Sequence, residues 1–175
     1  DLINSKHKLF ASIFFKTVMK SDLILLETKA LVKYMSNHNS NVKWFPNVRK
    51  ADSHIKSKSD YKRRFVFIGH IKKSKGVVEI INAFKSLDKS YNADLFGIIK
   101  DDVLNKINLP NNINFKGALR PNEVIPTLRN YDVLILPTFH EGEGYPGVII
   151  EAYSQGLPVI TTKWKQIPEI VLNNK

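Results

Sequence analysis

The stretch 131–161 constrains the fold of this chain more than any other part of the sequence. Residues 131–136 form a short, mostly apolar run that is typical of a buried strand. A glycine-rich loop follows at 141–147, then a helix-like apolar run at 148–155 and another apolar run at 158–161. Because a strand, a loop, a helix and a strand in this order form a parallel unit, we expect the loop at the carboxyl end of a parallel sheet. Open α/β folds bind their ligands at that edge.

The same alternation extends upstream and downstream of this stretch and predicts the fold class. Expected strands occupy 64–68, 93–99, 113–115, 133–136 and 158–161, and expected helices occupy 76–87, 101–107, 121–129, 148–155 and 167–172. Repeated strand–helix units imply an α/β fold with a Rossmann-like parallel sheet and helices on both faces. We expect this fold to be incomplete at both ends.

The first part of the chain differs from this alternation. Residues 1–47 predict a helix at 4–20, a strand at 22–26, a helix at 29–37 capped by Thr28 and a strand at 42–45. Residues 48–62 are polar, basic and rich in serine, and no apolar period runs through them. We expect a linker at 48–62 and a separate domain at 63–175.

Composition excludes some classes of protein. The hydrophobic fraction of 43% allows an ordinary core, and the absence of cysteine excludes a disulfide scaffold and thiolate metal sites. The apolar stretch 9–18 is interrupted by Lys16 and is too short to span a bilayer. We expect an amphipathic helix there that packs on a domain or touches a membrane surface.

The formal net charge of +11 has two interpretations. One is an anionic partner such as nucleic acid, an acidic membrane surface or a phosphate-bearing substrate. The other is a lysine-rich surface with no specific partner. Because the lysines are scattered, and dense only at 56–64 and 72–75, we favour the second for most of them, with a weak attraction to membranes in addition.

Two carboxylates flank the start of the helix expected at 148–155. Glu143 lies in the loop, where glycines allow the backbone to approach a ligand closely, although a plain turn would use them too. Glu151 lies in the apolar helix and needs a partner. That partner could be the hydroxyls of a ligand's ribose or a lysine, and the residue alone favours a surface glutamate. A glycosidase pair is disfavoured, because no cleft for a distorted sugar is evident.

The loop 69–76 follows the first strand of the alternating region and faces the same edge of the sheet. Lys75 adjoins a helix start and is the best candidate to bind a phosphate, whereas Lys72 and Lys73 are expected in solvent. The spacing of a Walker loop is absent. His140 is more typical of a loop histidine than of a catalytic base. No second acidic cluster completes a metal site with Asp101 and Asp102, so no metal is expected.

Several short motifs occur in a fixed order along the second half of the chain. They are Phe67-Ile68-Gly69-His70 with Lys75-Gly76, Phe115-Lys116-Gly117, Leu136-Pro137-Thr138, Glu143-Gly144-Tyr145-Pro146-Gly147 with Glu151-Ala152, Gly156-Leu157-Pro158-Val159-Ile160 and Ile167-Pro168-Glu169-Ile170. Together they resemble the GT-B retaining glycosyltransferases of family four, the group-1 type. On this resemblance, 1–47 is the tail of the N-terminal acceptor-side domain, 48–62 the interdomain linker and 63–175 a truncated C-terminal nucleotide-sugar-binding domain.

The resemblance also implies a site. Glu143 and Lys75 would be the catalytic residues: Glu143 would contact hydroxyls of the donor sugar, and Lys75 would bind the diphosphate. Glu151 would hold the ribose hydroxyls. The full set of implied donor-binding residues is Gly69, His70, Lys75, Glu143, Gly144, Tyr145, Pro146, Gly147, Val148 and Glu151. The family uses no tightly bound metal or other cofactor, so the nucleoside-diphosphate sugar is the donor substrate.

The function implied is a hexosyltransferase that transfers a sugar, with retention, to a glycan or lipid-linked acceptor in bacterial surface polysaccharide biosynthesis. Such an enzyme would be cytoplasmic and peripheral at the inner face of the cell membrane. Two departures from the family matter. His70 stands where the family usually has arginine, and most of the acceptor domain is absent, so we expect little activity from the isolated chain.

Two alternatives remain at this stage. The chain could be a non-catalytic nucleotide-binding half, or a partner module, that needs a separate N-terminal domain. It could also bind nucleic acid, but that function predicts aromatic side chains interleaved with clustered lysines. Most tyrosines and phenylalanines here lie within apolar strand or helix runs instead. We therefore expect no nucleic-acid partner.

Overall fold

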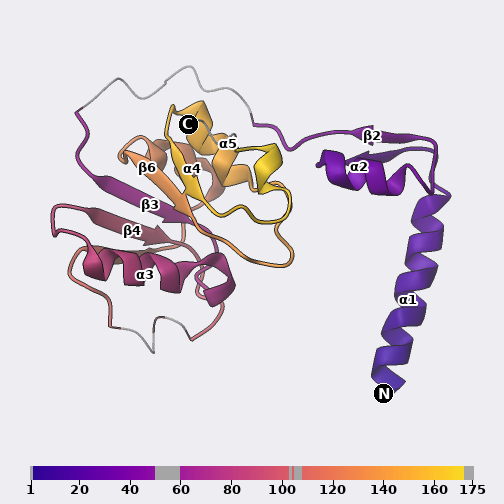
Figure 1. Cartoon of the computed structure of the whole chain (residues 1–175), viewed down its shortest axis with the longest axis horizontal. Helices are drawn as coiled ribbons and strands as arrows, with labels where there is room; N and C mark the ends of the chain where they lie inside the picture. Colours follow the sequence, from indigo (N-terminus) through magenta and orange to yellow (C-terminus); the bar gives the residue numbers. More distant parts are fainter. Residues whose placement is uncertain (1, 50–59, 103, 105–107, 172–175) are drawn as a thin grey trace. The chain divides into compact units, whose positions relative to one another are not determined.

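The computed structural model describes residues 2–49, 60–102, 104 and 108–171, which form two compact units, Asp1–Asn47 and Val48–Lys175 (Figure 1). Residues 50–59 of the predicted linker lie outside the described residues, so the assignment of 48–62 as an interdomain linker stays a prediction. None of the described helices is long and apolar enough to cross a membrane.

The first unit is small and built around one parallel pair of strands. Its elements are α1 (Leu2–Met19), β1 (Ile24–Leu26), α2 (Lys29–Met35) and β2 (Val42–Trp44). Ile24 pairs with Val42 in the register of the two strands, and both side chains are buried. The Thr28 hydroxyl accepts a hydrogen bond from the Leu31 N–H at 3.2 Å, which caps α2 as the sequence predicts.

The second unit is a five-stranded parallel sheet in the order β5-β4-β3-β6-β7. The strands are β3 (Arg64–Ile68), β4 (Asn92–Phe96), β5 (Ile113–Gly117), β6 (Val133–Leu136) and β7 (Val159–Thr161). The helices are α3 (Val77–Ser86), α4 (Pro121–Leu128) and α5 (Gly147–Ser154), with short 3-10 helices at Lys73–Lys75 and Ile167–Glu169. The sheet confirms the predicted α/β class.

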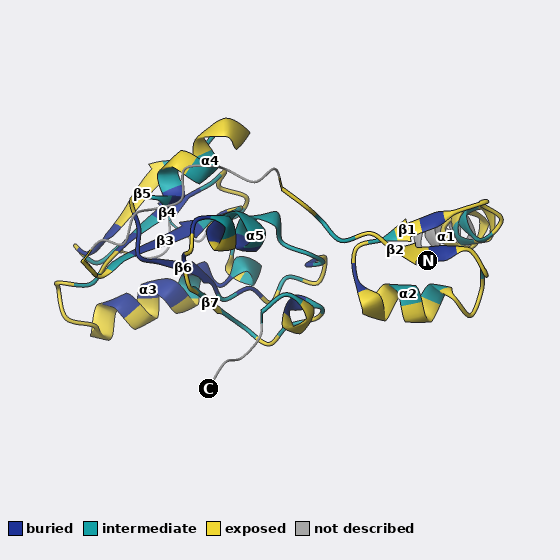
Figure 2. Ribbon diagram, turned by 90° about the horizontal axis from the view of Figure 1, so that it is seen from above, coloured by how far each residue is buried: buried dark blue, intermediate teal, exposed yellow. Residues whose placement is uncertain are grey.

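Helices cover both faces of this sheet. Figure 2 shows α3 on one side and α4 on the other, and α5 packs beside α4. The buried side of α3 carries Val77, Ile80, Ile81 and Phe84, a spacing that places one apolar stripe against the sheet. All four residues of β6 are buried, which agrees with the continuous apolar run in the sequence.

The strand order reverses at the junction of β3 and β6. From β3 the chain crosses to β4 on one side, and it later returns to place β6 on the other side of β3. In an open parallel sheet this reversal separates the loops that follow the two central strands and leaves a crevice between them. The loops 69–76 and 137–146 therefore flank the crevice where a ligand is expected.

The sequence prediction was accurate for the central strands and less accurate elsewhere. β3 and β6 have the predicted bounds, but β4 ends at Phe96 rather than at residue 99. Gly97 follows with a φ of 153°, and a Cβ at this position would lie 1.7 Å from the Gly69 carbonyl oxygen. The predicted helix at 101–107 is absent at Asp101 and Asp102, which form bends, while 103 and 105–107 lie outside the described residues.

Candidate functional site

The loops after β3 and β6 are joined directly. The Phe139 N–H donates a hydrogen bond to the Ser74 carbonyl oxygen at 2.9 Å. At Gly76, the residue just before α3, the backbone has a φ of 79°, and a Cβ would lie 2.1 Å from the Pro137 carbonyl oxygen. Only glycine combines this left-handed conformation with so close an approach. Gly76 therefore holds Lys75 next to the loop after β6.

An ion pair connects the two loops. The Lys75 Nζ donates to the Glu143 Oε2 at 2.6 Å, and the two side chains are only 15% and 7% exposed. The Thr138 hydroxyl donates to the same carboxylate oxygen at 2.6 Å. A buried carboxylate needs such partners, because an unpaired charge is strongly unfavourable away from water. The structure thus brings together the two residues that the resemblance assigns to catalysis.

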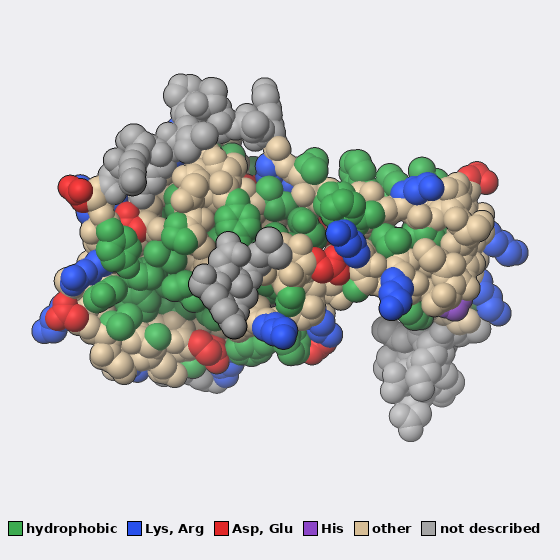
Figure 3. Space-filling view, turned by 45° about the horizontal axis from the view of Figure 1, so that its top comes forward, with side chains coloured by type: hydrophobic (Ala, Val, Ile, Leu, Met, Phe, Trp, Pro, Cys, Tyr) green, Lys and Arg blue, Asp and Glu red, His purple; other side chains and the backbone are tan. Residues whose placement is uncertain are grey.

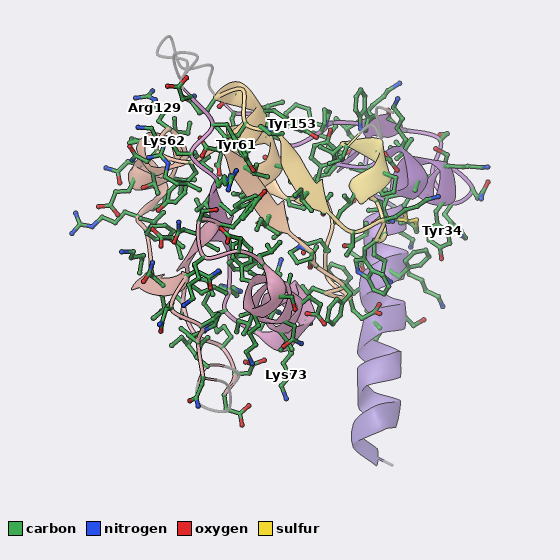
Figure 4. All side chains as sticks on the ribbon, turned by 60° about the vertical axis from the view of Figure 1, so that its left-hand side comes forward. Tyr34, Tyr61, Lys62, Lys73, Arg129 and Tyr153 are labelled. Carbon is green, nitrogen blue, oxygen red and sulfur yellow. The ribbon has the colours of Figure 1, made fainter. Side chains whose placement is uncertain are left out.

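Cationic groups surround this ion pair. Burial lowers the pKa of His70 below its ordinary value, and the nearby Lys100, Lys72, Lys75 and His140 lower it further. The Lys72 Nζ lies 3.3 Å from each ring nitrogen of His140. So many positive groups at one edge of the sheet create a potential that attracts an anion. Lys73, by contrast, is exposed and points away from the sheet, as expected (Figure 4).

A cleft of about 370 Å³ opens beside Lys75. Gly69 and His70 line it from the loop after β3. Sequence reasoning missed the lining residues that follow β4 and β5, which are Gly97, Ile98, Ala118 and Leu119. Gly97 and Gly117 were the available signal, because glycine within or at the end of a strand often marks a close backbone approach.

The loop from Glu143 leads into α5. Gly144, Tyr145 and Pro146 precede its first residue, Gly147, so the backbone N–H groups of the first turn face outward from the helix N-terminus. Val148 lies in that turn. These positions agree with a phosphate-binding segment, and their role stays a prediction.

Glu151 has a different partner from Glu143. Its Oε1 accepts a hydrogen bond from the Arg49 Nε at 2.6 Å, with the two side chains 17% and 34% exposed. The sequence analysis did not single out Arg49, since a partner so far away along the chain leaves no local signal. Among the described residues, Glu151 makes no side-chain hydrogen bond or ion pair with Lys75 or Glu143.

No group of three or more His, Asp or Glu in the part of the chain that the structure describes is placed to hold a metal ion. On the face drawn in Figure 3, the Lys and Arg side chains are scattered rather than gathered into one stripe. The geometry of the loops brings Lys72, Lys75 and Lys100 together near His70.

Comparison with known proteins identifies the family. Residues 62–175 match the family described as glycosyl transferases group 1. The chain belongs to this family, and its second unit has the fold of a GT-B C-terminal domain, which confirms the resemblance seen in the sequence.

Individual relatives agree with this assignment. An uncharacterized glycosyltransferase of Methanocaldococcus jannaschii is 29% identical over 175 residues, covering 87% of this chain and 42% of the relative. The capsular polysaccharide biosynthesis glycosyltransferase CapM of Staphylococcus aureus is 33% identical over 116 residues, covering 62% of this chain and 30% of CapM. The chain therefore spans less than half the length of these relatives.

Solved structures share the fold at lower identity. Anabaena HepE in complex with UDP and glucose superposes with a TM-score of 0.70 at 17% identity, covering 86% of this chain and 47% of HepE. TarM superposes with a TM-score of 0.73 at 19% identity, covering 94% of this chain and 34% of TarM.

Proposed function

We propose that this chain is the donor-binding half of a hexosyltransferase that transfers a sugar, with retention, from a nucleoside-diphosphate sugar to a glycan or lipid-linked acceptor. The observation that carries the proposal is the Lys75–Glu143 pair at the reversal of strand order, beside a cleft lined by Gly69 and His70. The ligands of HepE, UDP and glucose, support a sugar-nucleotide donor.

The positive cluster suits the leaving group. Departure of a nucleoside diphosphate from the sugar develops negative charge on its phosphate oxygens, and preorganised cations stabilise that charge. Lys75 is oriented by its contact with Glu143 at 2.6 Å, and Lys72 lies near it on the same loop. The backbone of Gly144 to Val148, at the N-terminus of α5, would add N–H donors to the diphosphate.

The two carboxylates would bind different parts of the donor. Glu143 is mostly buried beside Lys75, which suits hydrogen bonds to the sugar hydroxyls next to the diphosphate. Glu151, on the second turn of α5, would accept hydrogen bonds from the ribose hydroxyls and exchange Arg49 for them. Neither role involves a metal ion.

We infer that the pathway is the synthesis of a bacterial surface polysaccharide, as the name of CapM suggests for that relative. A cytoplasmic enzyme peripheral at the inner face of the membrane would meet a lipid-linked acceptor there. The net charge of +11 would attract it to anionic lipids, and Ile13 and Phe14 of α1 are exposed apolar side chains that suit such contact.

A thermal-shift screen tests the donor site. UDP-glucose, UDP-N-acetylglucosamine and GDP-mannose are added to the wild type and to the Lys75→Ala and Lys73→Ala variants. A ligand at a hundred times its Kd stabilises a protein by about 2.7 kcal/mol. We expect at least one compound to raise the Tm of the wild type and of Lys73→Ala, but not of Lys75→Ala. If none of them shifts the wild type, the chain has no donor site of its own.

A further inference from the structure

Thr138 is a polar residue buried at the centre of the site. It follows Pro137 at the end of β6 and is fully buried. The sequence analysis placed it within a motif but gave it no role. A buried hydroxyl is retained only where its hydrogen bonds are satisfied, so its partners indicate its purpose.

The hydroxyl of Thr138 points its proton at Glu143. Its Oγ1 lies 2.6 Å from the Glu143 Oε2, against 3.5 Å from the Ser74 carbonyl oxygen. Because a hydroxyl has one proton, the shorter contact to the carboxylate takes it. The same oxygen accepts a hydrogen bond from the His140 N–H at 3.2 Å, which sets the rotation of the hydroxyl.

The backbone of Thr138 is held on both sides. Its N–H donates to the Leu136 carbonyl oxygen at 2.8 Å, and its carbonyl oxygen accepts from the hydroxyl of Thr162, in the loop after β7. A hydroxyl on so constrained a backbone has little freedom to move. Thr138 is therefore a fixed donor, unlike the long and flexible side chain of Lys75.

The carboxylate of Glu143 is anchored through one oxygen. Thr138 and Lys75 both donate to Oε2, and among the described residues Oε1 accepts no hydrogen bond. Oε1 is also absent from the buried polar atoms without a partner, so it is accessible to solvent. This asymmetry leaves Oε1 available to a ligand.

We propose that Thr138 is the positioning residue of the donor-sugar site: it holds Oε2 of Glu143 so that Oε1 faces a hydroxyl of the sugar. This inference rests on the proposed function. When Lys75 turns to the diphosphate, its contact with Glu143 weakens, and Thr138 is then the side-chain donor that keeps the carboxylate in place.

The test compares Thr138→Val, which removes the hydroxyl at nearly constant shape, with Thr138→Ser, which keeps it. Isothermal titration measures the Kd of UDP-glucose, UDP-N-acetylglucosamine and GDP-mannose, each against its parent UDP or GDP. We expect Thr138→Val to weaken the binding of the sugar nucleotide by about tenfold or more, which is the scale of one hydrogen bond to a charged group. The Kd of the parent diphosphate should stay unchanged. In Thr138→Ser, the ratio of the Kd of the sugar nucleotide to that of the diphosphate should equal the wild-type ratio.

Each outcome has a definite meaning. Equal weakening of the sugar nucleotide and the diphosphate in Thr138→Val would show a merely structural role and overturn the inference. The inference would also be overturned if Thr138→Val kept the wild-type ratio of the Kd of the sugar nucleotide to the Kd of the diphosphate while Glu143→Gln lost the preference for the sugar. The proposed function would stand in that case. A wild type that binds none of the compounds would overturn the proposed function, and the role of Thr138 with it.

Discussion

Two ion pairs of the second unit, Lys75–Glu143 and Arg49–Glu151, differ in burial and in support. The Lys75–Glu143 pair lies between the loops after β3 and β6, is mostly buried and receives a third group, the Thr138 hydroxyl. The Arg49–Glu151 pair lies at α5, and its arginine side chain is 34% exposed. The first pair is built into the crevice of the sheet, whereas the second joins α5 to the first residues of the predicted linker. We infer that the first is preorganised and that the second is exchangeable.

The largest effect on stability is expected from Gly76→Ala, because Gly76 holds Lys75 of the first pair next to the loop after β6. The substitution forces a Cβ to within 2.1 Å of the Pro137 carbonyl oxygen at a φ of 79°. The strain should lower the free energy of unfolding by about 4 kcal/mol, measured by urea denaturation. Gly117→Ala is the matched control, because a Cβ at Gly117, with a φ of 80°, meets no atom within 4 Å. Equal losses in the two variants would show that the close approach is not what matters.

The next effect concerns the first pair itself. Lys75→Ala leaves the carboxylate of Glu143 without its cation in a site where that side chain is 7% exposed. Breaking a buried pair in this way should cost about 3 kcal/mol in the free energy of unfolding. The double variant Lys75→Ala with Glu143→Gln should recover part of this loss. A single variant as stable as the wild type would contradict the view that this pair is buried and coupled.

A smaller effect is expected at the second pair. Arg49→Ala should change the free energy of unfolding by about 0.5 kcal/mol, since partly exposed ion pairs contribute little. Its effect on ligand binding should be opposite in sign to that of Lys75→Ala, because Glu151 is then available to the ribose without exchange. Titration calorimetry with a sugar nucleotide measures this. Weaker binding in Arg49→Ala would mean that the arginine itself holds the donor.

The smallest expected effect is the change in stability and in ligand affinity with pH. His70 has a lowered pKa, caused by burial and then by Lys100, Lys72, Lys75 and His140. Its neutral form is therefore favoured in the folded chain, so stability falls as the pH decreases through the ordinary histidine value of about 6.5. A bound diphosphate favours the cation and raises this pKa. The affinity for UDP-glucose should then increase as the pH falls from about 7 to about 6.

NMR titration of the His70 ring, with and without UDP-glucose, measures this shift directly. A sugar nucleotide is used because it carries no terminal phosphate that titrates in this range. His70→Gln should abolish the histidine-dependent part of the pH profile. A pKa that stays the same when the ligand binds would place the diphosphate away from His70.

Much of the fold could be predicted because the spacing of apolar residues is a property of neighbouring positions in the sequence. β3 and β6 have the predicted bounds, and α3 differs by one residue at each end. The ends of β4 and α3 depend on contacts instead: Gly97 and Gly76 each approach the backbone of another loop. Such contacts are not visible in the pattern of neighbouring residues.

The residues of the candidate site could be predicted from the sequence, but many of the contacts between them could not. Lys75 and Glu143 follow strands whose carboxyl ends meet in any parallel sheet of this kind, so their convergence could be expected. The burial of Thr138 and the lining of the cleft by Ala118 and Leu119 could not be expected from the sequence. A short polar residue after a strand has the same appearance in a surface turn.

The sequence by itself determined the α/β class, the family and the loops that carry the charged residues, because periodicity and motifs are properties of consecutive residues. Only the tertiary structure decided which charges meet: Lys75 with Glu143 and Arg49 with Glu151. The physical reason is that an ion pair depends on the distance between two atoms in space. For residues far apart in the chain, that distance is set by strand order and by the close approach of loops.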